Sequence, residues 1–364
     1  MSLQSGEWRE HIDEVDAALI DEFQSDFPIQ ERPFEAVGEA LGVSAETALD
    51  RVKQLRDDGI FRRFGPVLNP PVIGSSTLAA VSAPEDRFDE VAEIINEYRQ
   101  VNHNYARDHE WNMWFVVTAG SRQRRDEILS EIEERTGCSV LVLPMLTDYY
   151  IDLEFPVVNG DRFARETRLA DASPDERAAQ PRVGESLEAT DASATRISED
   201  AAADLSELDR RLLLEIQTGF PLVATPYRDV ADAVDADVSE VLSAIKRLKR
   251  TGCIKRIGCV VNHIVTGFDN NCMVVWDVPD DALDERGQAV GELPYVTLCY
   301  HRPRRPDQDW QYNLFTMIHG REAAVVDQKI DELATEHLPY DHDRLYSTAT
   351  LKQTGARYDD IVGQ

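Results

Sequence analysis

The chain has 364 residues, 42% of them hydrophobic, which is enough for two to four packed domains. It contains no run of about 18 apolar residues, so we expect no membrane span. The formal net charge is −30, a balance typical of proteins from salt-loving cytoplasm, and such a surface repels duplex DNA unless it carries a local basic face. The acidic stretch 1–16 lacks the apolar segment of a secretory signal, so we expect a cytoplasmic protein.

The five cysteines are scattered along the chain and form no C-x-x-C pair. An odd number at irregular spacing argues against a disulfide framework and against a zinc site. We therefore expect buried, reduced thiols and no bound metal. These residues are Cys138, Cys253, Cys259, Cys272 and Cys299.

The N-terminal region predicts three short helices and a wing. Apolar residues recur at helical spacing over 12–23, 34–41 and 48–55. Gly42 breaks the second helix, and Ser44 is a good N-cap for the third. A glycine-bearing turn between two helices is typical of a helix-turn-helix. The stretch 60–68, with Gly65-Pro66 in its middle, predicts a short hairpin wing.

A pattern of strands and helices follows the wing. Strands are predicted at 77–83, 101–107, 113–118 and 140–143, with helices around 88–95 and 128–132. The resulting order βαββαβ is that of a ferredoxin-like domain. The second half of the chain repeats this order, with a weaker last strand near 344–350.

The first unit returns 193 residues later, so that Asp16 corresponds to Asp209 and Arg63 to Arg256. A shift this long indicates a duplicated two-domain unit and not a solenoid. We predict an α+β protein of two tandem units, each a winged helix-turn-helix followed by a ferredoxin-like domain. The predicted boundaries are 8–69 and 70–158 for the first copy, 159–204 for an acidic flexible linker, and 205–262 and 263–361 for the second copy.

Each helix-turn-helix could read DNA with its third helix. The start of that helix, however, carries Glu46 and Asp50 in the first copy and Asp237 and Glu240 in the second. Carboxylates at this place would face phosphates. We therefore expect a structural or dimer-forming role for these modules and no DNA binding.

The stretch 101–117 places His, Tyr, Arg, Trp and Asn beside an apolar run. His103, Tyr105 and Arg107 alternate, so on a strand all three lie on one face. Such a mixture suits the wall of a pocket for a flat ligand that bears carboxylates. A solvent-exposed sheet face is the alternative.

The second half contains a related stretch. Tyr300 corresponds to Tyr105, whereas Leu298 stands where His103 would align. His301 and Arg302 are adjacent and point to opposite faces of a strand, so they cannot both serve one pocket simply.

The wings contain the pairs Arg62-Arg63 and Lys255-Arg256. One basic residue of each pair should point toward a neighbouring domain. It is either a solvated edge-strand charge or a guanidinium that binds a substrate carboxylate. We favour Arg63 for the second role because Arg256 holds the same place.

Four motifs resemble those of the siroheme decarboxylases, proteins of the alternative haem and haem d1 pathways whose architecture is similar to that of the Lrp/AsnC regulators. The motifs are GIFRRFG, VNHNYARDHEWNMWF, TLCYHRPRRPDQDWQYNLFTMIHGR and LYSTATLKQTGARY. The resemblance covers both copies and leaves out only the linker. It implies that two subunits are fused here into one pseudo-dimeric chain, which could pair again into a homo-oligomer.

The resemblance implies non-oxidative removal of the C12 and C18 acetate carboxyls of siroheme, giving 12,18-didecarboxysiroheme. No separate cofactor is expected, since the iron is part of the substrate. His103 would protonate the carbanion and Tyr105 would orient or relay the proton, with iron ligation as the alternative role of His103. The residues expected to bind the substrate are Arg63, Arg107, Trp111, Asn112, Arg256, Tyr300, His301, Arg302 and Lys352.

Two other functions are compatible with the sequence. One is a transcriptional regulator of the Lrp/AsnC kind that binds DNA and responds to a haem-like effector. The other is a haem-sensing or haem-carrying module without chemistry.

Overall fold

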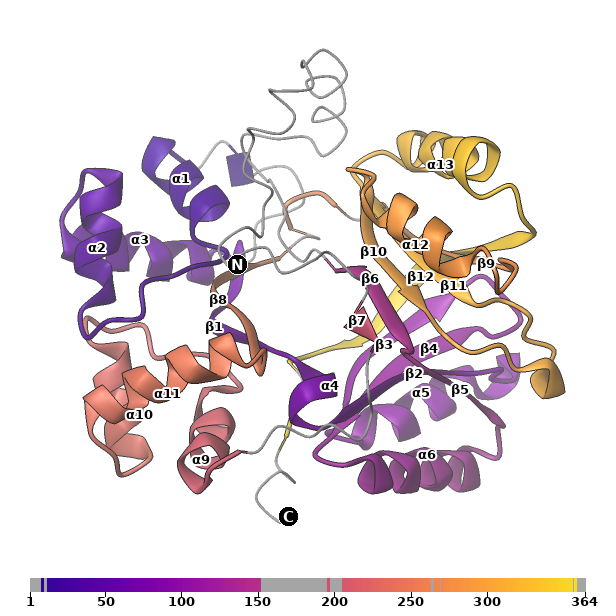
Figure 1. Ribbon diagram of the computed structural model, residues 1–364, viewed down its shortest axis with the longest axis horizontal. Helices are drawn as coiled ribbons and strands as arrows, with labels where there is room; N and C mark the ends of the chain where they lie inside the picture. The colour runs from indigo at the N-terminus through magenta and orange to yellow at the C-terminus, as the bar shows by residue number, and fades with distance from the viewer. Residues whose placement is uncertain are drawn as a thin grey trace.

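The computed structural model describes residues 8–9, 12–151, 195–196, 205–262, 265–268, 270–355 and 357–358. It forms one helical lobe and one lobe built on a β-sheet, which lie side by side (Figure 1). The α+β class and the two tandem units predicted from the sequence are confirmed.

The helices of the described residues are α1 (Glu14–Glu22), α2 (Pro33–Leu41), α3 (Ala45–Asp57), α4 (Pro70–Ile73), α5 (Phe88–Glu97), α6 (Arg122–Thr136), α9 (Glu207–Ile216), α10 (Pro226–Ala233), α11 (Val238–Arg250), α12 (Leu283–Gly291) and α13 (Ala323–Glu332). The strands are β1 (Phe61–Leu68), β2 (Ser75–Val81), β3 (Val101–Arg107), β4 (Met113–Ala119), β5 (Val140–Pro144), β6 (Thr147–Ile151), β7 (Thr195–Arg196), β8 (Ile254–Val261), β9 (Asn270–Trp276), β10 (Val296–His301), β11 (Leu314–Gly320) and β12 (His342–Gln353).

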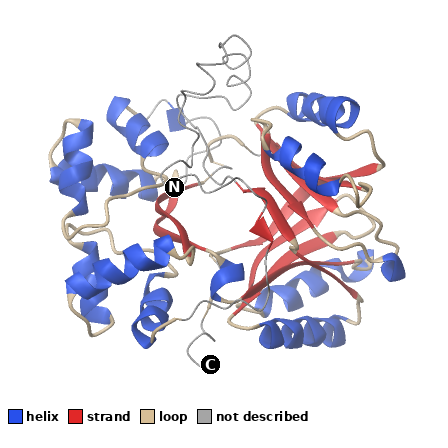
Figure 2. Ribbon diagram, viewed as in Figure 1, coloured by secondary structure: helices blue, strands red, loops and turns tan. Residues whose placement is uncertain are grey.

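Capping residues set the helix ends in the helical lobe. Gly42 ends α2 in the left-handed conformation, and the Ser44 side chain accepts a hydrogen bond from the Thr47 amide at the start of α3. Asp237 and Glu240 form a capping box at the start of α11. The two helix-turn-helix modules share one hydrophobic core, so the lobe is a single packed body (Figure 2).

The wing differs from the predicted hairpin. β1 is one strand, and it pairs antiparallel with β8 of the other copy. Gly65 and Gly258, which are equivalent in the repeat, face each other in this pairing. A Cβ at Gly65 would lie 2.5 Å from the Gly219 Cα, and a Cβ at Gly258 would lie 2.3 Å from the Gln24 carbonyl oxygen. We call the pair of strands β1 and β8 the wing ribbon. Glycine is required at both positions because at each of them a loop of the helical lobe passes close to the backbone of the wing ribbon.

Both ferredoxin-like units contribute to a ten-stranded sheet of order β5-β2-β4-β3-β12-β9-β11-β10-β6-β7. β12 pairs first with β9 of its own copy and then, from Ser347 to Gln353, with β3 of the first copy. β6 pairs with β10 of the second copy in the corresponding way. The last strand of each copy therefore pairs with a strand of the other copy. The sequence predicts a strand near 344–350 but not this exchange.

The sheet curls round until its ends meet, because β5 and β6 are consecutive in the chain yet lie at opposite ends of the strand order. β7 falls inside the predicted linker 159–204 and pairs with β6, and the rest of that linker lies outside the described residues.

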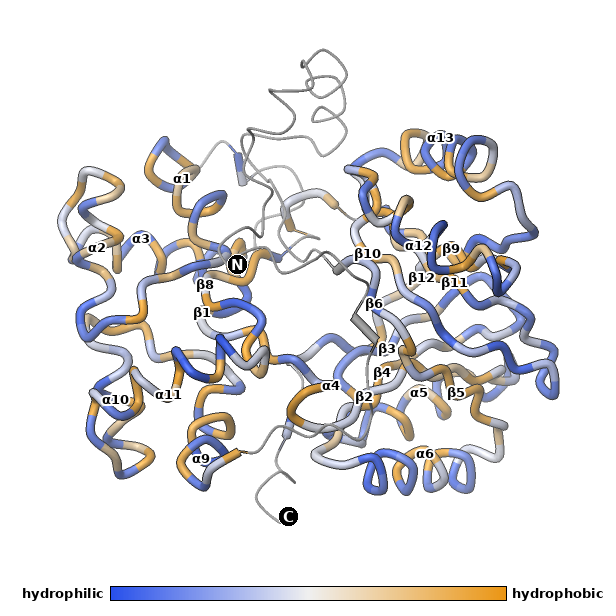
Figure 3. The backbone as a smooth tube through the Cα atoms, in the orientation of Figure 1, coloured by the Kyte–Doolittle hydropathy of each residue, from blue (hydrophilic) through white to orange (hydrophobic). Residues whose placement is uncertain are grey.

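Three hydrophobic cores support this lobe. Helices α5 and α6 cover one part of the sheet, and α12 and α13 cover the other. A third core, built from residues of both copies, fills the interior between the two parts, with Trp114, Trp310 and Phe315 among its members. Figure 3 shows hydrophilic residues along the outer side of α6, as expected for a helix that buries its other side.

All five cysteines are free and buried, as predicted. Of the helices in the described ranges, none combines the length and the apolar content required to cross a bilayer.

Candidate active site

Strand β3 carries a ladder of three polar side chains on its inner face. Tyr105 pairs with Trp114 of the interior core, so this face points between the two parts of the sheet. The His103 and Tyr105 rings stack with centroids 6.1 Å apart, and the Arg107 guanidinium carbon lies 5.9 Å from the Tyr105 centroid. The predicted common face of these three residues is confirmed.

Strand β10 carries the equivalent ladder in the second copy. Its members are Leu298 and Tyr300 on β10 and Arg302 directly after it, and the Arg302 guanidinium carbon lies 4.6 Å from the Tyr300 ring centroid. Tyr300 packs against the interior core that contains Trp114, the β4 partner of Tyr105. Both ladders therefore border the same interior.

The two ladder arginines are tied across the copies. Arg107 Nη1 donates to the carbonyl of Leu345 on β12, and Arg302 Nη1 donates to the carbonyl of Leu143 on β5. Their exposed fractions are only 7% and 8%. Burial lowers the pKa of Arg107 to about 10 and also lowers the pKa of Arg302.

Neither guanidinium has a carboxylate partner among the described residues, and the Nε of each lacks a hydrogen-bond acceptor there. A buried charge is costly unless an opposite charge compensates it. The interior thus holds two cations, on Arg107 and Arg302, that an anionic ligand would neutralise.

The wing ribbon presents one basic residue to each ladder. Arg62 interacts electrostatically with His103 and Tyr105, and its Nη2 donates to Gln353 Oε1 at 2.5 Å. At the other end of the ribbon, Lys255 Nζ lies 3.9 Å from Asp148 Oδ2 on β6.

Burial lowers the pKa of both Arg62 and Lys255, yet the Arg62 residue is exposed and the Lys255 side chain is 29% exposed. Arg62 reaches Gln353, which lies opposite His103, and Lys255 reaches Asp148, which lies opposite Tyr300. We call the region bounded by Arg62, Lys255 and the two ladders the recess.

The pKa of His103, a titratable group of the recess, lies well below its ordinary value. Burial, with a smaller contribution from the Arg62 cation, lowers its pKa to about 4. The imidazole is therefore neutral at pH 7. Burial raises the pKa of Tyr105, so its phenol keeps the proton.

Two of the expected arginines lie on the other face of the ribbon. Arg256 is buried, and its Nη1 donates to the Gln24 carbonyl in the helical lobe at 2.5 Å. Arg63 donates to the Pro66 carbonyl, and burial together with the nearby Arg256 cation lowers its pKa to about 10. The structure places Arg62 and Lys255 beside the ladders, and not Arg63 and Arg256, which were expected to bind the substrate.

Asn112, which was expected to bind the substrate, makes hydrogen bonds to the protein backbone instead. Its amide accepts from the Ala83 N–H at 2.9 Å and donates to the Ala83 carbonyl at 2.8 Å. Asn313 makes the same pair of bonds to Val278 in the second copy. Both amides therefore close the same loop in the fold and do not face the recess.

His301 and Lys352 lie away from the recess as well. Trp111 packs against the interior core near the Arg107 end of the first ladder, and its carbonyl accepts from Trp114 Nε1 at 2.6 Å. His301 pairs with Leu314, which belongs to the core under α12 and α13. Lys352 Nζ donates to the carbonyls of Asn96 and Tyr98 at 2.7 and 2.8 Å, so it holds the end of α5.

Three residues of the recess were missed from the sequence. Arg62 and Lys255 had a readable signal, because both copies have a basic residue at this repeat position. Asp148 had none, because nothing in the sequence shows that β6 pairs with β10 beside Tyr300.

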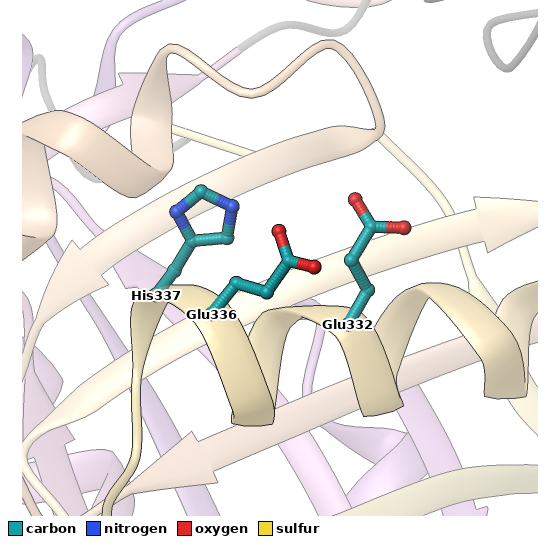
Figure 4. A group of neighbouring side chains, drawn as sticks. All are labelled: Glu332, Glu336 and His337. Carbon is teal, nitrogen blue, oxygen red and sulfur yellow. The ribbon is translucent and has the colours of Figure 1, made fainter.

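A group of potential metal ligands lies elsewhere, at the end of α13 and in the π-helical turn that follows. Ligand atoms of Glu332, Glu336 and His337 lie within 4.8 Å of one another and extend from one side of the helix (Figure 4). Glu332 already pairs with Lys329 at 3.1 Å. This group contacts neither ladder and takes no part in the recess.

Comparison with known families gives two matches in each copy. A family described as siroheme decarboxylase NirDL-like HTH domain matches residues 16–62 and 209–254. A family described as AsnC-like ligand binding domain matches residues 73–149 and 265–352.

Individual proteins agree with these matches. The siroheme decarboxylase NirDL subunit of Paracoccus denitrificans is 34% identical, covering 96% of this chain and 99% of its own. A siroheme decarboxylase NirD subunit of Pseudomonas aeruginosa is 44% identical over 40% of this chain and 97% of its own. A crystal structure of a siroheme decarboxylase NirDL with an iron-uroporphyrin III analogue has the same fold, with a TM-score of 0.66 and 24% identity over 96% of this chain and 95% of that one.

Proposed function

The chain belongs to the siroheme decarboxylase family, and on that premise we propose that it removes the C12 and C18 acetate carboxyls of siroheme as CO₂, giving 12,18-didecarboxysiroheme. The observation that carries this proposal is the pair of buried guanidinium groups, Arg107 and Arg302, without carboxylate partners among the described residues. A flat macrocycle with eight carboxylates supplies the missing charge.

The recess also explains how a strongly acidic protein can bind a substrate with many carboxylates. A polyanion is repelled by a protein with a net charge of −30 unless cations are concentrated where it binds. Arg62, Arg107 and Arg302 provide this concentration around the two tyrosines. The phenol rings give the aromatic surface that a macrocycle packs against.

Each decarboxylation breaks the bond between the acetate CH₂ and its carboxyl carbon. The electron pair stays on the CH₂ carbon, with its charge spread into the macrocycle, and one proton converts it to a methyl group. Desolvation of the leaving carboxylate favours this step, because CO₂ is uncharged. The protein must therefore supply one proton per carboxyl and exclude water.

His103 is the proposed proton donor, with Tyr105 as the group that orients it or relays its proton. Burial, with a smaller contribution from the Arg62 cation, keeps the pKa of the imidazole low, and a substrate carboxylate bound at Arg62 would raise that pKa and favour the protonated form. The other role, ligation of the substrate iron, uses the neutral imidazole. The second copy has Leu298 at this place and supplies the opposing wall.

The test is anaerobic incubation of the purified protein with siroheme at high salt, followed by mass analysis of the pigment. Loss of two CO₂ is expected. A stable coloured complex without mass loss would indicate a carrier, and a shift of a DNA duplex that survives high salt would indicate a regulator. The cytoplasmic location expected from the sequence stays a prediction.

The same experiment separates the two roles of His103. With His103→Ala, loss of turnover with an unchanged absorption band of the bound pigment assigns the proton-donor role. Loss of turnover together with a shifted band assigns iron ligation. Full turnover in this variant would remove His103 from the site.

A further inference from the structure

The two halves of the recess differ in charge as well as in the His103 position. In the pairing of β3 with β12, Tyr105 lies opposite Thr350. In the equivalent pairing of β10 with β6, Tyr300 lies opposite Asp148. The same frame therefore places a hydroxyl beside one tyrosine and a carboxylate beside the other.

The wing ribbon adds to this difference. Arg62 faces the first half and contacts only neutral amides there, Gln353 Oε1 at 2.5 Å and Asn262 Oδ1 at 3.3 Å. Lys255 faces the second half, where its Nζ lies 3.9 Å from Asp148 Oδ2. Among the described residues, the ribbon thus gives the first half an uncompensated positive charge and the second half an ion pair.

Both members of the ion pair lie where their charges act strongly. The exposed fractions are 29% for the Lys255 side chain and 23% for the Asp148 side chain, and burial raises the pKa of Asp148 while Lys255 lowers it. Charges that are partly desolvated are screened less by salt than surface charges. A ligand carboxylate is consequently attracted more strongly by Arg62 than by Lys255, whose charge Asp148 compensates.

We propose that Asp148, paired with Lys255, decides which edge of the substrate faces His103 and hence which of the two acetates is lost first. This inference rests on the proposed function. The two acetates then leave in turn at the single half that contains His103, with the macrocycle repositioned between the steps. Each step consumes one proton and releases one CO₂, as above, and needs no oxidant or co-reactant.

The test compares Asp148→Asn, which removes the charge but keeps the shape, with Asp148→Thr, which copies Thr350. A reaction stopped after partial turnover is separated by chromatography, and the two singly decarboxylated isomers are identified by NMR. We expect the wild type to give one isomer in at least tenfold excess. Both variants should bring the ratio to within about threefold of unity.

The matched variant Thr350→Asp places a carboxylate beside Tyr105 and Arg62. It should lower kcat/KM at least tenfold and also reduce the isomer excess. An equal isomer mixture from the wild type, or a wild-type ratio from an active Asp148→Asn, would overturn the proposal. A change with Asp148→Thr but not with Asp148→Asn would show a steric effect and would overturn it too.

A binding measurement keeps this inference separate from the proposed function. Iron uroporphyrin III, an octacarboxylate, is titrated into the full chain by absorbance at several salt concentrations. Asp148→Asn should bind it at least threefold more tightly, with a steeper salt dependence, and an unchanged affinity contradicts the charge argument. If no protein releases CO₂ from siroheme while this affinity change is present, it is the proposed function that fails.

Discussion

The two halves of the recess show what duplication has kept and what it has changed. Tyr105 and Arg107 in the first copy have equivalents in Tyr300 and Arg302, and both arginines donate to a backbone carbonyl of the other copy, on β12 and on β5 respectively. His103, in contrast, is replaced by Leu298. The tyrosine and arginine of the two ladders are therefore symmetric. The imidazole, which can move a proton or bind iron, is present in the first ladder only.

This difference separates binding from chemistry within one recess. A symmetric pair of buried cations suits a macrocycle with carboxylates around its whole edge. With His103 as the proposed proton donor, a single imidazole would restrict the reaction to one position of that edge. Variants that make the halves alike should therefore affect turnover, whereas variants that remove the shared frame should affect affinity.

The largest effect is expected from His103→Leu, which makes the first ladder a copy of the second. Turnover of siroheme should fall by at least about 100-fold, the usual contribution of a positioned proton donor. Circular dichroism should show an unchanged fold. The comparison variant Leu298→Ala alters the equivalent place and should cost less than about tenfold; an equal loss in both variants would contradict a one-sided chemistry.

A smaller effect is expected from Arg107→Met and Arg302→Met, which remove one cation of the symmetric frame. Each should weaken binding of iron uroporphyrin III by about 10- to 100-fold, because a carboxylate loses its buried partner. The measurement is an absorbance titration. Arg122→Met makes the same charge change at a side chain that is 58% exposed on α6 and should change affinity less than twofold. If it weakens binding equally, net charge and not position is the cause.

Lys352→Met tests a residue that lies on β12 near Thr350 but faces the helices. Loss of its bonds to the Asn96 and Tyr98 carbonyls should lower the free energy of unfolding by about 1–2 kcal/mol, measured by urea denaturation. The KM for siroheme should stay within twofold. A raised KM without loss of stability would place this lysine in the recess after all.

The smallest effect is a difference in acid sensitivity between the wild type and His103→Leu. The pKa of His103 in the folded protein is about 4, below its ordinary value of 6.5, so protonation favours unfolding. Above pH 6.5 the ring is neutral in both the folded and the unfolded chain, so it does not affect the free energy of unfolding. As the pH falls from 6.5 toward 4, the ring is protonated in the unfolded chain first, and the free energy of unfolding decreases. Between pH 7 and pH 5 the wild type should lose about 1 kcal/mol more than His103→Leu in urea denaturation, since the ring still touches solvent. Equal losses would show that this imidazole is not desolvated.

Local features of the fold could be predicted from the sequence. The helical spacing of apolar residues, the Ser44 cap and the duplication all follow from rules that act within a few residues or from direct comparison of the two halves. The pairing of β1 with β8 and of β12 with β3 could not be predicted, because alternation shows which side chains share a face but not which strand lies beside them.

The same limit explains the outcome for the site. The common face of His103, Tyr105 and Arg107 was predicted correctly because one strand is enough to align them. Arg63 was preferred over Arg62 because Arg256 holds the same place in the repeat, but the repeat does not show which face of β1 turns toward the sheet. Asn112 and Lys352 have the chemistry of ligand-binding residues, but backbone groups of the fold occupy them.

The exchange of last strands has a consequence for synthesis of the chain on the ribosome. β3 ends at Arg107 and its partner β12 begins at His342, so about 235 residues must be made before they can meet. At roughly 5–20 residues per second, the nascent chain carries this unsatisfied edge for about 12–47 seconds. An open strand edge is a template for aggregation, and the dense negative charge of the surrounding chain keeps neighbouring nascent chains apart during that interval.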